Sequence, residues 1–74
     1  MNIRLLSCDA ARPDKRAITK LLEEVGEGLS NFDAQDLTEI LLDGDAVEIS
    51  VSDKNRSSSS RGLRKLDIDY ELLD

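Results

Sequence analysis

The 74-residue sequence contains no histidine or tryptophan, and only one cysteine, one proline, one phenylalanine and one tyrosine. Without histidine, the chain cannot activate a serine or cysteine nucleophile as a catalytic triad does. A single cysteine excludes an intrachain disulfide and argues against a tetrahedral zinc site. No apolar run is long enough for a signal peptide or a membrane span, so we expect a cytoplasmic protein without membrane contact. The missing residue types lead us to expect a non-catalytic protein without cofactor or metal.

Two small groups remain as candidates for chemistry, and each has a simpler interpretation. The thiol of Cys8 has no neighbouring base in the sequence, so we interpret it as a small apolar residue at the end of a strand. Asp43, Asp45 and Glu48 offer oxygen ligands for Ca²⁺ or Mg²⁺, but the complete calcium-loop pattern is absent. We interpret them as a turn that ends a helix, followed by the solvated face of a strand.

Apolar residues recur with a helical period in two stretches. The first helix is predicted to begin near Pro13 and to end at Gly26, with an apolar face of Ala17, Ile18, Leu21, Leu22 and Val25. The second is predicted to begin after Ser30, which fits a capping box with Asp33, or alternatively at Asp33, paired with Asp36. Its apolar face comprises Ala34, Leu37, Ile40 and Leu41. The short connection predicts an antiparallel helical hairpin.

Three further stretches, residues 2–7, 47–51 and 66–72, are predicted strands, the last two with a period of two. In the last of them, Leu66, Ile68, Tyr70 and Leu72 alternate with charged residues, so we expect all four to point into the core. Residues 53–62 include four consecutive serines and predict a mobile polar hairpin loop. We also expect Phe32, the only phenylalanine, to be needed in the core.

The element order predicts one domain over residues 1–74 with an α+β fold. The order is strand, helix, helix, strand, strand. It predicts a two-layer sandwich in which the helical hairpin covers one face of a three-stranded sheet, with a long polar loop between the second and third strands.

Part of this pattern is similar to a known family. The stretch from Lys20 to Val25, a bend containing glycine, and Asp33-Ala34-Gln35-Asp36-Leu37 together resemble the helical hairpin in the C-terminal domain of the ribosomal stalk protein. In that family a short strand precedes the hairpin and further strands follow it. The family's glycine-leucine bend is not matched well, and its third helix has no predicted counterpart because the serine-rich loop occupies that place. The resemblance implies a helical hairpin and transfers no functional residue.

Charge is distributed unevenly along the chain. The net charge is −6, which argues against non-specific binding to nucleic acid or to an anionic membrane. One stretch is nevertheless basic, with Asp53 as its only acidic residue. We call it the basic segment; its charged side chains are Lys54, Arg56, Arg61, Arg64 and Lys65. A second candidate is the acidic sheet face, formed by Glu48, Asp67, Asp69 and Glu71.

These two surfaces support different functions. The acidic sheet face is typical of a protein-interaction module, such as an adaptor, an inhibitor or a subunit of an assembly, and this is the function we expect. Its carboxylates lack the apolar pocket that an acid–base pair requires. The basic segment supports the alternative, an accessory protein that binds RNA or phosphate. A homodimer formed through the edge of the last strand is a further alternative.

Overall fold

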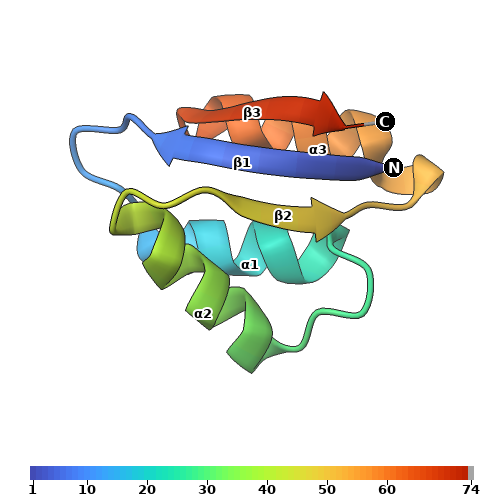
Figure 1. Cartoon of the computed structure of the whole chain (residues 1–74), viewed down its shortest axis with the longest axis horizontal. Helices are drawn as coiled ribbons and strands as arrows, with labels where there is room; N and C mark the ends of the chain where they lie inside the picture. The colour runs from blue at the N-terminus through green and yellow to red at the C-terminus, as the bar shows by residue number, and fades with distance from the viewer. Residues whose placement is uncertain (74) are drawn as a thin grey trace.

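A computed structural model describes residues 1–73 of the chain (Figure 1). The elements are β1 (Asn2–Cys8), α1 (Lys15–Val25), α2 (Asn31–Leu42), β2 (Val47–Ser50), the 3₁₀ turn η1 (Asp53–Asn55), α3 (Arg56–Lys65) and β3 (Ile68–Leu73). The fold is α+β, with a three-stranded antiparallel sheet and three helices. The predicted order of three strands and the first two helices is confirmed, and α3 is an element that we did not expect.

The sheet has the strand order β2-β1-β3, with β1 in the centre. Both neighbours run antiparallel to β1, so β2 and β3 run in the same direction on opposite sides of it (Figure 1). Two strands that run in the same direction cannot be joined by a hairpin and require a crossover, usually a helix. The prediction of a hairpin loop between these strands is therefore wrong, since α3 makes the crossover.

The prediction that residues 53–62 form a mobile loop is corrected by η1 and α3, which extend through residue 65. Serine and glycine are weak helix formers, which is why the sequence favoured a loop. Two residues one turn apart, Ser59 and Leu63, are nevertheless fully buried, and packing of this face overrides the local preference. Helix α3 occupies the place of the predicted serine-rich loop, so the expectation that no third helix is present is wrong.

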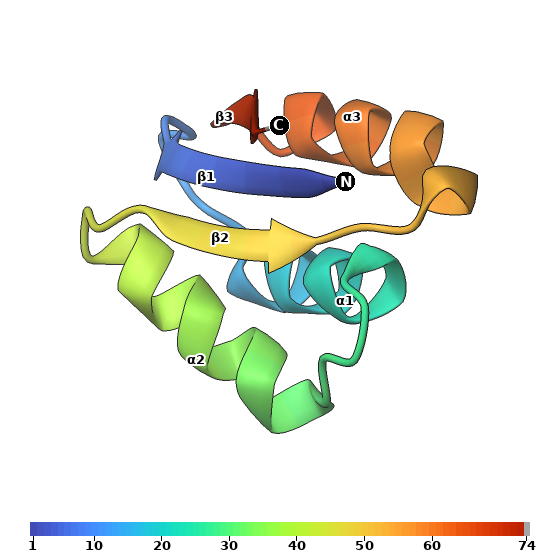
Figure 2. The same ribbon diagram turned by 45° about the vertical axis from the view of Figure 1, so that its right-hand side comes forward.

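The hydrophobic core is shared by the three helices and one face of the sheet. Its strand residues are Ile3, Leu5, Val47, Ile49, Val51 and Ile68; its helix residues are Ile18, Leu22, Val25, Ala34, Leu41 and Leu63. In Figure 2, α2 crosses below β2 while α3 runs beside β3, so different helices pack against the two outer strands of the sheet. Burial alternates strictly along β2, as its period of two predicted.

Of the two helix starts in the hairpin, that of α1 lies two residues beyond the predicted Pro13, and that of α2 lies as predicted. The Asp14 carboxylate accepts the N–H of Ala17 at 3.0 Å and caps α1. At α2, the N–H of Asp33 donates to Ser30 Oγ at 3.2 Å, and the N–H of Ser30 donates to Asp33 Oδ2 at 3.3 Å. The predicted capping box is therefore confirmed.

Several apolar residues lie outside the core positions that the sequence predicted. Phe32 is 78% exposed and Ile40 is 41% exposed, while the unpredicted Thr38 is fully buried on α2. Leu72 is 51% exposed, although it pairs with the fully buried Ile3. Leu66 is half-buried and precedes the strand, since the chain turns at Asp67 with a φ of 58°. Of the four inward positions predicted for the last strand, only Ile68 is fully in the core.

A bulge in β1 explains why its alternation breaks down. The pairing with β3 shifts between Leu5 and Ser7, so Leu6 is an extra residue without a partner on β3. After the bulge, Cys8 pairs with Ile68 and packs against the core, whereas Leu6 is partly exposed.

Within residues 1–73, no helix has the length and apolar character needed to span a bilayer.

Candidate partner-binding surfaces

The acidic sheet face is divided by a cation on the central strand. The Arg4 guanidinium lies 2.9 Å from Glu48 Oε1 on one side and 2.9 Å from Glu71 Oε1 on the other. A hydrogen bond from Arg4 to Glu48, followed by their charge attraction, raises the pKa of Arg4 above its ordinary value. Glu48 and Glu71, two of the four predicted acidic residues, therefore form ion pairs with Arg4 that link the three strands.

The other two acidic residues occupy different positions. Asp69 lies on β3 opposite Ser7, and none of the salt bridges within residues 1–73 includes it. Asp67 lies in the turn before β3, where its carbonyl accepts the N–H of Asp9 at 2.8 Å. Asp67 therefore does not belong to the sheet face as predicted. Together with Asp9, Arg64, Ile68 and Asp69, it lines a shallow hollow of about 240 Å³.

The structure brings only part of the basic segment together. Arg61, Arg64 and Lys65 are exposed, and their spacing of three and four places them on one side of α3, opposite Leu63. Arg56 begins the helix and Lys54 lies in η1, so these two are near its other end. None of the five forms a salt bridge to a carboxylate within residues 1–73.

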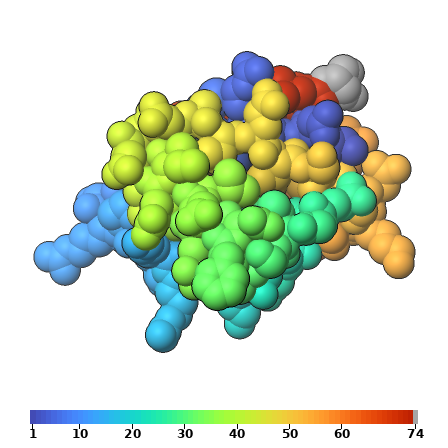
Figure 3. Space-filling view, turned by 60° about the horizontal axis from the view of Figure 1, so that its bottom comes forward, coloured from blue at the N-terminus to red at the C-terminus, as the bar shows by residue number. Residues whose placement is uncertain are grey.

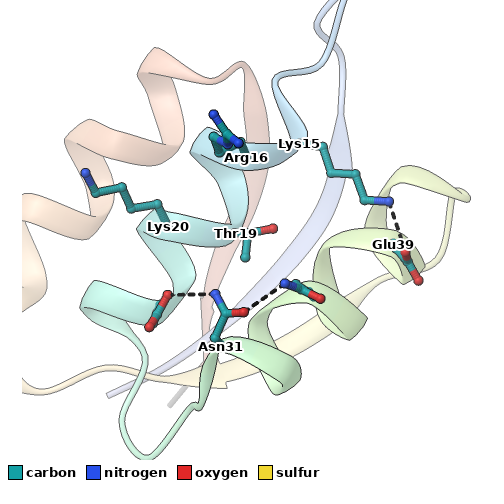
Figure 4. A pocket seen from close by; sticks show the side chains of 8 residues that line it. Lys15, Arg16, Thr19, Lys20, Asn31 and Glu39 are labelled. Carbon is teal, nitrogen blue, oxygen red and sulfur yellow. Dashed lines mark hydrogen bonds and ion pairs between the residues drawn. The ribbon is translucent and has the colours of Figure 1, made fainter.

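A groove between α1 and α2 is a feature that the sequence analysis missed. It has a volume of about 690 Å³ and lies on the side of the hairpin away from the sheet (Figure 4). It is lined by residues with polar or charged side chains, whose aliphatic stems also contribute to its surface: Lys15, Arg16, Thr19, Lys20, Glu23, Asn31, Gln35 and Glu39. The helical spacing of these residues could have indicated it, but only the packing of the two helices creates the groove.

Polar bonds between the two helices cross this groove. Lys15 Nζ lies 2.9 Å from Glu39 Oε1, which closes one end. Near the other end, the Asn31 amide donates to Glu23 at 3.1 Å and accepts from Gln35 at 2.8 Å. Figure 4 shows these side chains engaged with one another across the opening. The polar groups that line the groove are therefore already bonded to one another at these positions.

The exposed side of α2 is the second feature that the sequence analysis missed. Phe32, Asp36 and Ile40 are four residues apart and form one row along the helix, which we call the α2 ridge. Figure 3 views the molecule from the side on which α2, in green, lies toward the reader. A helical wheel with Ala34 and Leu41 inward would have placed Phe32 outward. The sequence analysis instead expected Phe32 in the core because its side chain is large.

The remaining candidate residues are the Cys8 thiol and the carboxylates that follow α2. The Cys8 thiol is half-buried and donates to the carbonyl of Leu66 at 3.6 Å. Among residues 1–73, no group of three histidine, cysteine or carboxylate side chains is placed to hold a metal ion. Asp43 instead caps the C-terminal end of α2, where its N–H donates to the carbonyl of Glu39 at 3.0 Å.

Comparison of the chain with protein-family models, curated proteins and solved structures finds no match. The function proposed below therefore rests on the exposed surfaces described above.

Proposed function

We propose that this chain is a non-catalytic, cytoplasmic protein-interaction module, built as a two-layer α+β sandwich, that binds a partner protein through the α2 ridge. The observation that carries the proposal is Phe32, whose side chain is 78% exposed on a helix with a fully formed capping box. Phe32 is the only phenylalanine of a chain with a small core, so placing its side chain in water forgoes a large gain from burial.

The chemistry around Phe32 indicates what kind of partner would fit. Aromatic side chains surrounded by polar residues commonly dominate the binding energy of protein interfaces. Here Asp33 and Asp36 lie beside Phe32, and Ile40 extends the apolar contact along the helix. The complementary surface is an apolar pocket with a basic rim, and the net charge of −6 would speed association with such a partner.

Site-specific photocrosslinking in the native cell would test this proposal. A photoreactive phenylalanine analogue at position 32 should form one predominant crosslinked product, whereas the same analogue at the exposed position of Ser57 on α3 should not. Replacing Ile40 with Ser should weaken crosslinking from position 32, because Ile40 lies on the same row. Equal crosslinking from both positions, or no effect of Ile40→Ser, would contradict the proposal.

A second candidate function is binding of RNA or another phosphate-bearing ligand through the basic segment. It is supported by the exposed cluster of Arg61, Arg64 and Lys65 on α3, which has no carboxylate partner within residues 1–73. Guanidinium groups on a helix can contact successive phosphates.

Salt dependence would separate this function from the first. If the basic segment binds RNA, affinity should fall steeply as salt rises, and the combined change of Arg56, Arg61 and Arg64 to Ala should abolish binding. Phe32→Ser should leave RNA binding unchanged. An absence of RNA binding at low salt would exclude RNA as the ligand of the basic segment and leave the first candidate untouched.

A further inference from the structure

Strand β3 forms one edge of the sheet, and the two edges differ. The edge of β2 is partly covered, because Gly26 bridges to Val51 and the N–H of Glu27 donates to the carbonyl of Ser50 at 2.7 Å. On β3, the only strand partner among residues 1–73 is β1. Its outer side is therefore an edge of six residues with no strand beside it.

The pairing of β1 shows which backbone groups of β3 point outward. Met1 and Val51 exchange two bonds, at 2.7 and 3.1 Å, so Met1, Ile3 and Leu5 direct their backbone groups toward β2. The alternate residues of β1, including Arg4, direct theirs toward β3 and Glu71. By the same alternation, the N–H and C=O groups of Tyr70 and Leu72 point away from the sheet.

The side chains of β3 present a different chemistry on each face. Ile68, Tyr70 and Leu72 lie on the core side, where Leu72 is 51% exposed. Asp69, Glu71 and Leu73 lie on the opposite side, where Glu71 is paired with Arg4 at 2.9 Å. A neighbouring strand would therefore meet an apolar row on one face and, on the other, the two acidic side chains followed by Leu73.

These rows oppose pairing of β3 with a second copy of itself. A symmetric antiparallel dimer that keeps both cores on one side must place like faces opposite each other. If the dimer is centred on Tyr70, Asp69 lies opposite Glu71 of the other copy; if it is centred on Asp69 or Glu71, that carboxylate lies opposite its own equivalent. Like charges in such positions are destabilising. A dimer centred on Leu72 avoids them by placing Glu71 opposite Leu73, but it pairs only residues 71–73 of the described strand.

We propose that the free edge of β3 accepts an extended strand from another protein in which apolar residues alternate with lysine or arginine. The outward backbone groups of Tyr70 and Leu72 would continue the sheet, apolar residues would cover Leu72, and basic residues would lie beside Asp69 and Glu71. This surface is separate from the α2 ridge and does not depend on it.

A synthetic peptide provides the direct test. A seven-residue peptide that alternates valine with lysine should bind, and binding should slow hydrogen exchange of the Tyr70 and Leu72 amides at least about tenfold, because both become bonded. The amide of Glu71 already faces β1 and serves as the internal reference. A peptide with glutamate in place of lysine, and one with the same composition but grouped lysines, should not give this protection. Equal protection by all three peptides, or none by the alternating peptide at saturation, would overturn the proposal.

Two substitutions at one exposed position separate backbone pairing from side-chain contact. Leu72→Pro removes an outward N–H and places a ring at the edge, while proline is compatible with an edge strand. It should abolish peptide binding and preserve the far-ultraviolet circular dichroism spectrum. Leu72→Ala keeps the N–H and should retain binding with only a several-fold loss. Binding unaffected by Leu72→Pro, with the fold intact, would show that the peptide lies elsewhere.

The role of charge can be tested on the protein without a peptide. In Asp69→Lys, the dimer centred on Tyr70 would place the introduced lysine opposite Glu71 twice, so the variant should dimerise at concentrations at least about tenfold below those that affect the parent chain. Adding Leu72→Pro should reverse this, as sedimentation would show. A variant that stays monomeric, or a parent that dimerises equally well, would overturn the charge argument. Phe32→Ser should alter neither experiment, so this proposal can fail independently of the α2 ridge.

Discussion

At the residue scale, the buried pair Thr19 and Thr38 joins the two helices of the hairpin. The Thr19 hydroxyl donates to Thr38 Oγ1 at 3.0 Å, and the Thr38 hydroxyl donates to the carbonyl of Ala34 at 2.7 Å. Both hydroxyls are thus satisfied, and no buried side-chain nitrogen or oxygen among residues 1–73 lacks a partner. This chain of bonds allows a polar residue to occupy a core position of α2.

We expect Thr38→Val to lower the free energy of unfolding by about 1–3 kcal/mol, because it leaves the Thr19 hydroxyl without its acceptor. Replacing both threonines with valine should recover most of that loss, since no unpaired group then remains. Urea unfolding of the two single variants and the double variant would measure the coupling. Simple addition of the two single effects would show that the bond contributes little.

A second residue-scale feature is the tight end of α1 at Gly26. A Cβ atom there would lie 2.7 Å from the carbonyl oxygen of Leu22 and would clash with Leu29 Cδ1. The conformation itself is open to other residues, since φ is −76°. The glycine is therefore required by close contact with backbone and side chain.

We expect Gly26→Ala to destabilise the fold by about 1–3 kcal/mol, as overpacking does in other cores. The exposed neighbour Glu27 provides the control, and Glu27→Ala should change stability by no more than about 0.5 kcal/mol. Thermal unfolding followed by circular dichroism would compare them. Equal midpoints for Gly26→Ala and the parent would show that the connection to α2 shifts without cost.

At the scale of elements, α3 depends on tertiary packing more than α1 or α2 does. Four serines and a glycine lie within its ten residues, and its N-cap residue Asn55 makes no side-chain capping bond. Its stability comes from Leu63, which is fully buried, and from the close approach of Gly62 to α1, where an added Cβ would lie 2.6 Å from Leu21 Cδ1. Helices this short are marginal in water without such contacts.

We expect Leu63→Ala to cost about 2–5 kcal/mol, because it leaves a cavity at the only large apolar contact that α3 makes in the core. Hydrogen exchange should show the amides of α3 losing protection before those of α1. Arg61→Ala, on the exposed side of the same helix, should stay within about 0.5 kcal/mol of the parent. Uniform loss of protection across all three helices would instead show that α3 unfolds only with the whole domain.

At the scale of the whole molecule, net repulsion is the main electrostatic term. The chain has 16 acidic and 10 basic side chains. They are confined within principal extents of 30 × 22 × 18 Å. Exposed ion pairs such as those of Arg4 contribute little to stability and are screened by salt. At an ionic strength of about 0.01 M, repulsion acts across the whole molecule, since the screening length is then about 30 Å.

We therefore expect sodium chloride, raised from about 0.01 M to about 0.5 M, to increase the free energy of unfolding modestly, because it screens the excess negative charge. Urea unfolding at both concentrations would measure the change. In Arg4→Ala the increase should be larger, since that variant loses a compensating cation. A decrease with salt in the parent chain would show that the ion pairs outweigh the net repulsion.

Local patterns in the sequence determined the elements that depend on near neighbours. The helices of the hairpin, the Ser30 capping box, the alternation of Val47 and Ile49 and the general α+β class all follow from spacing and capping chemistry. The candidate surfaces were predictable only in part. The alternation of β3 correctly placed Asp69 and Glu71 on its outer face, but the division of that face by Arg4 required knowledge of the strand order.

Only the tertiary structure decided α3, the order of the strands and the exposure of Phe32. A serine-rich stretch becomes helical because β2 and β3 run in the same direction, which demands a crossover, and because Leu63 finds a place beside α1. The free edge of β3 and the α2 ridge arise for the same reason. Both surfaces are exposed because no other element packs against them. Which elements pack together depends on contacts between residues far apart in the chain.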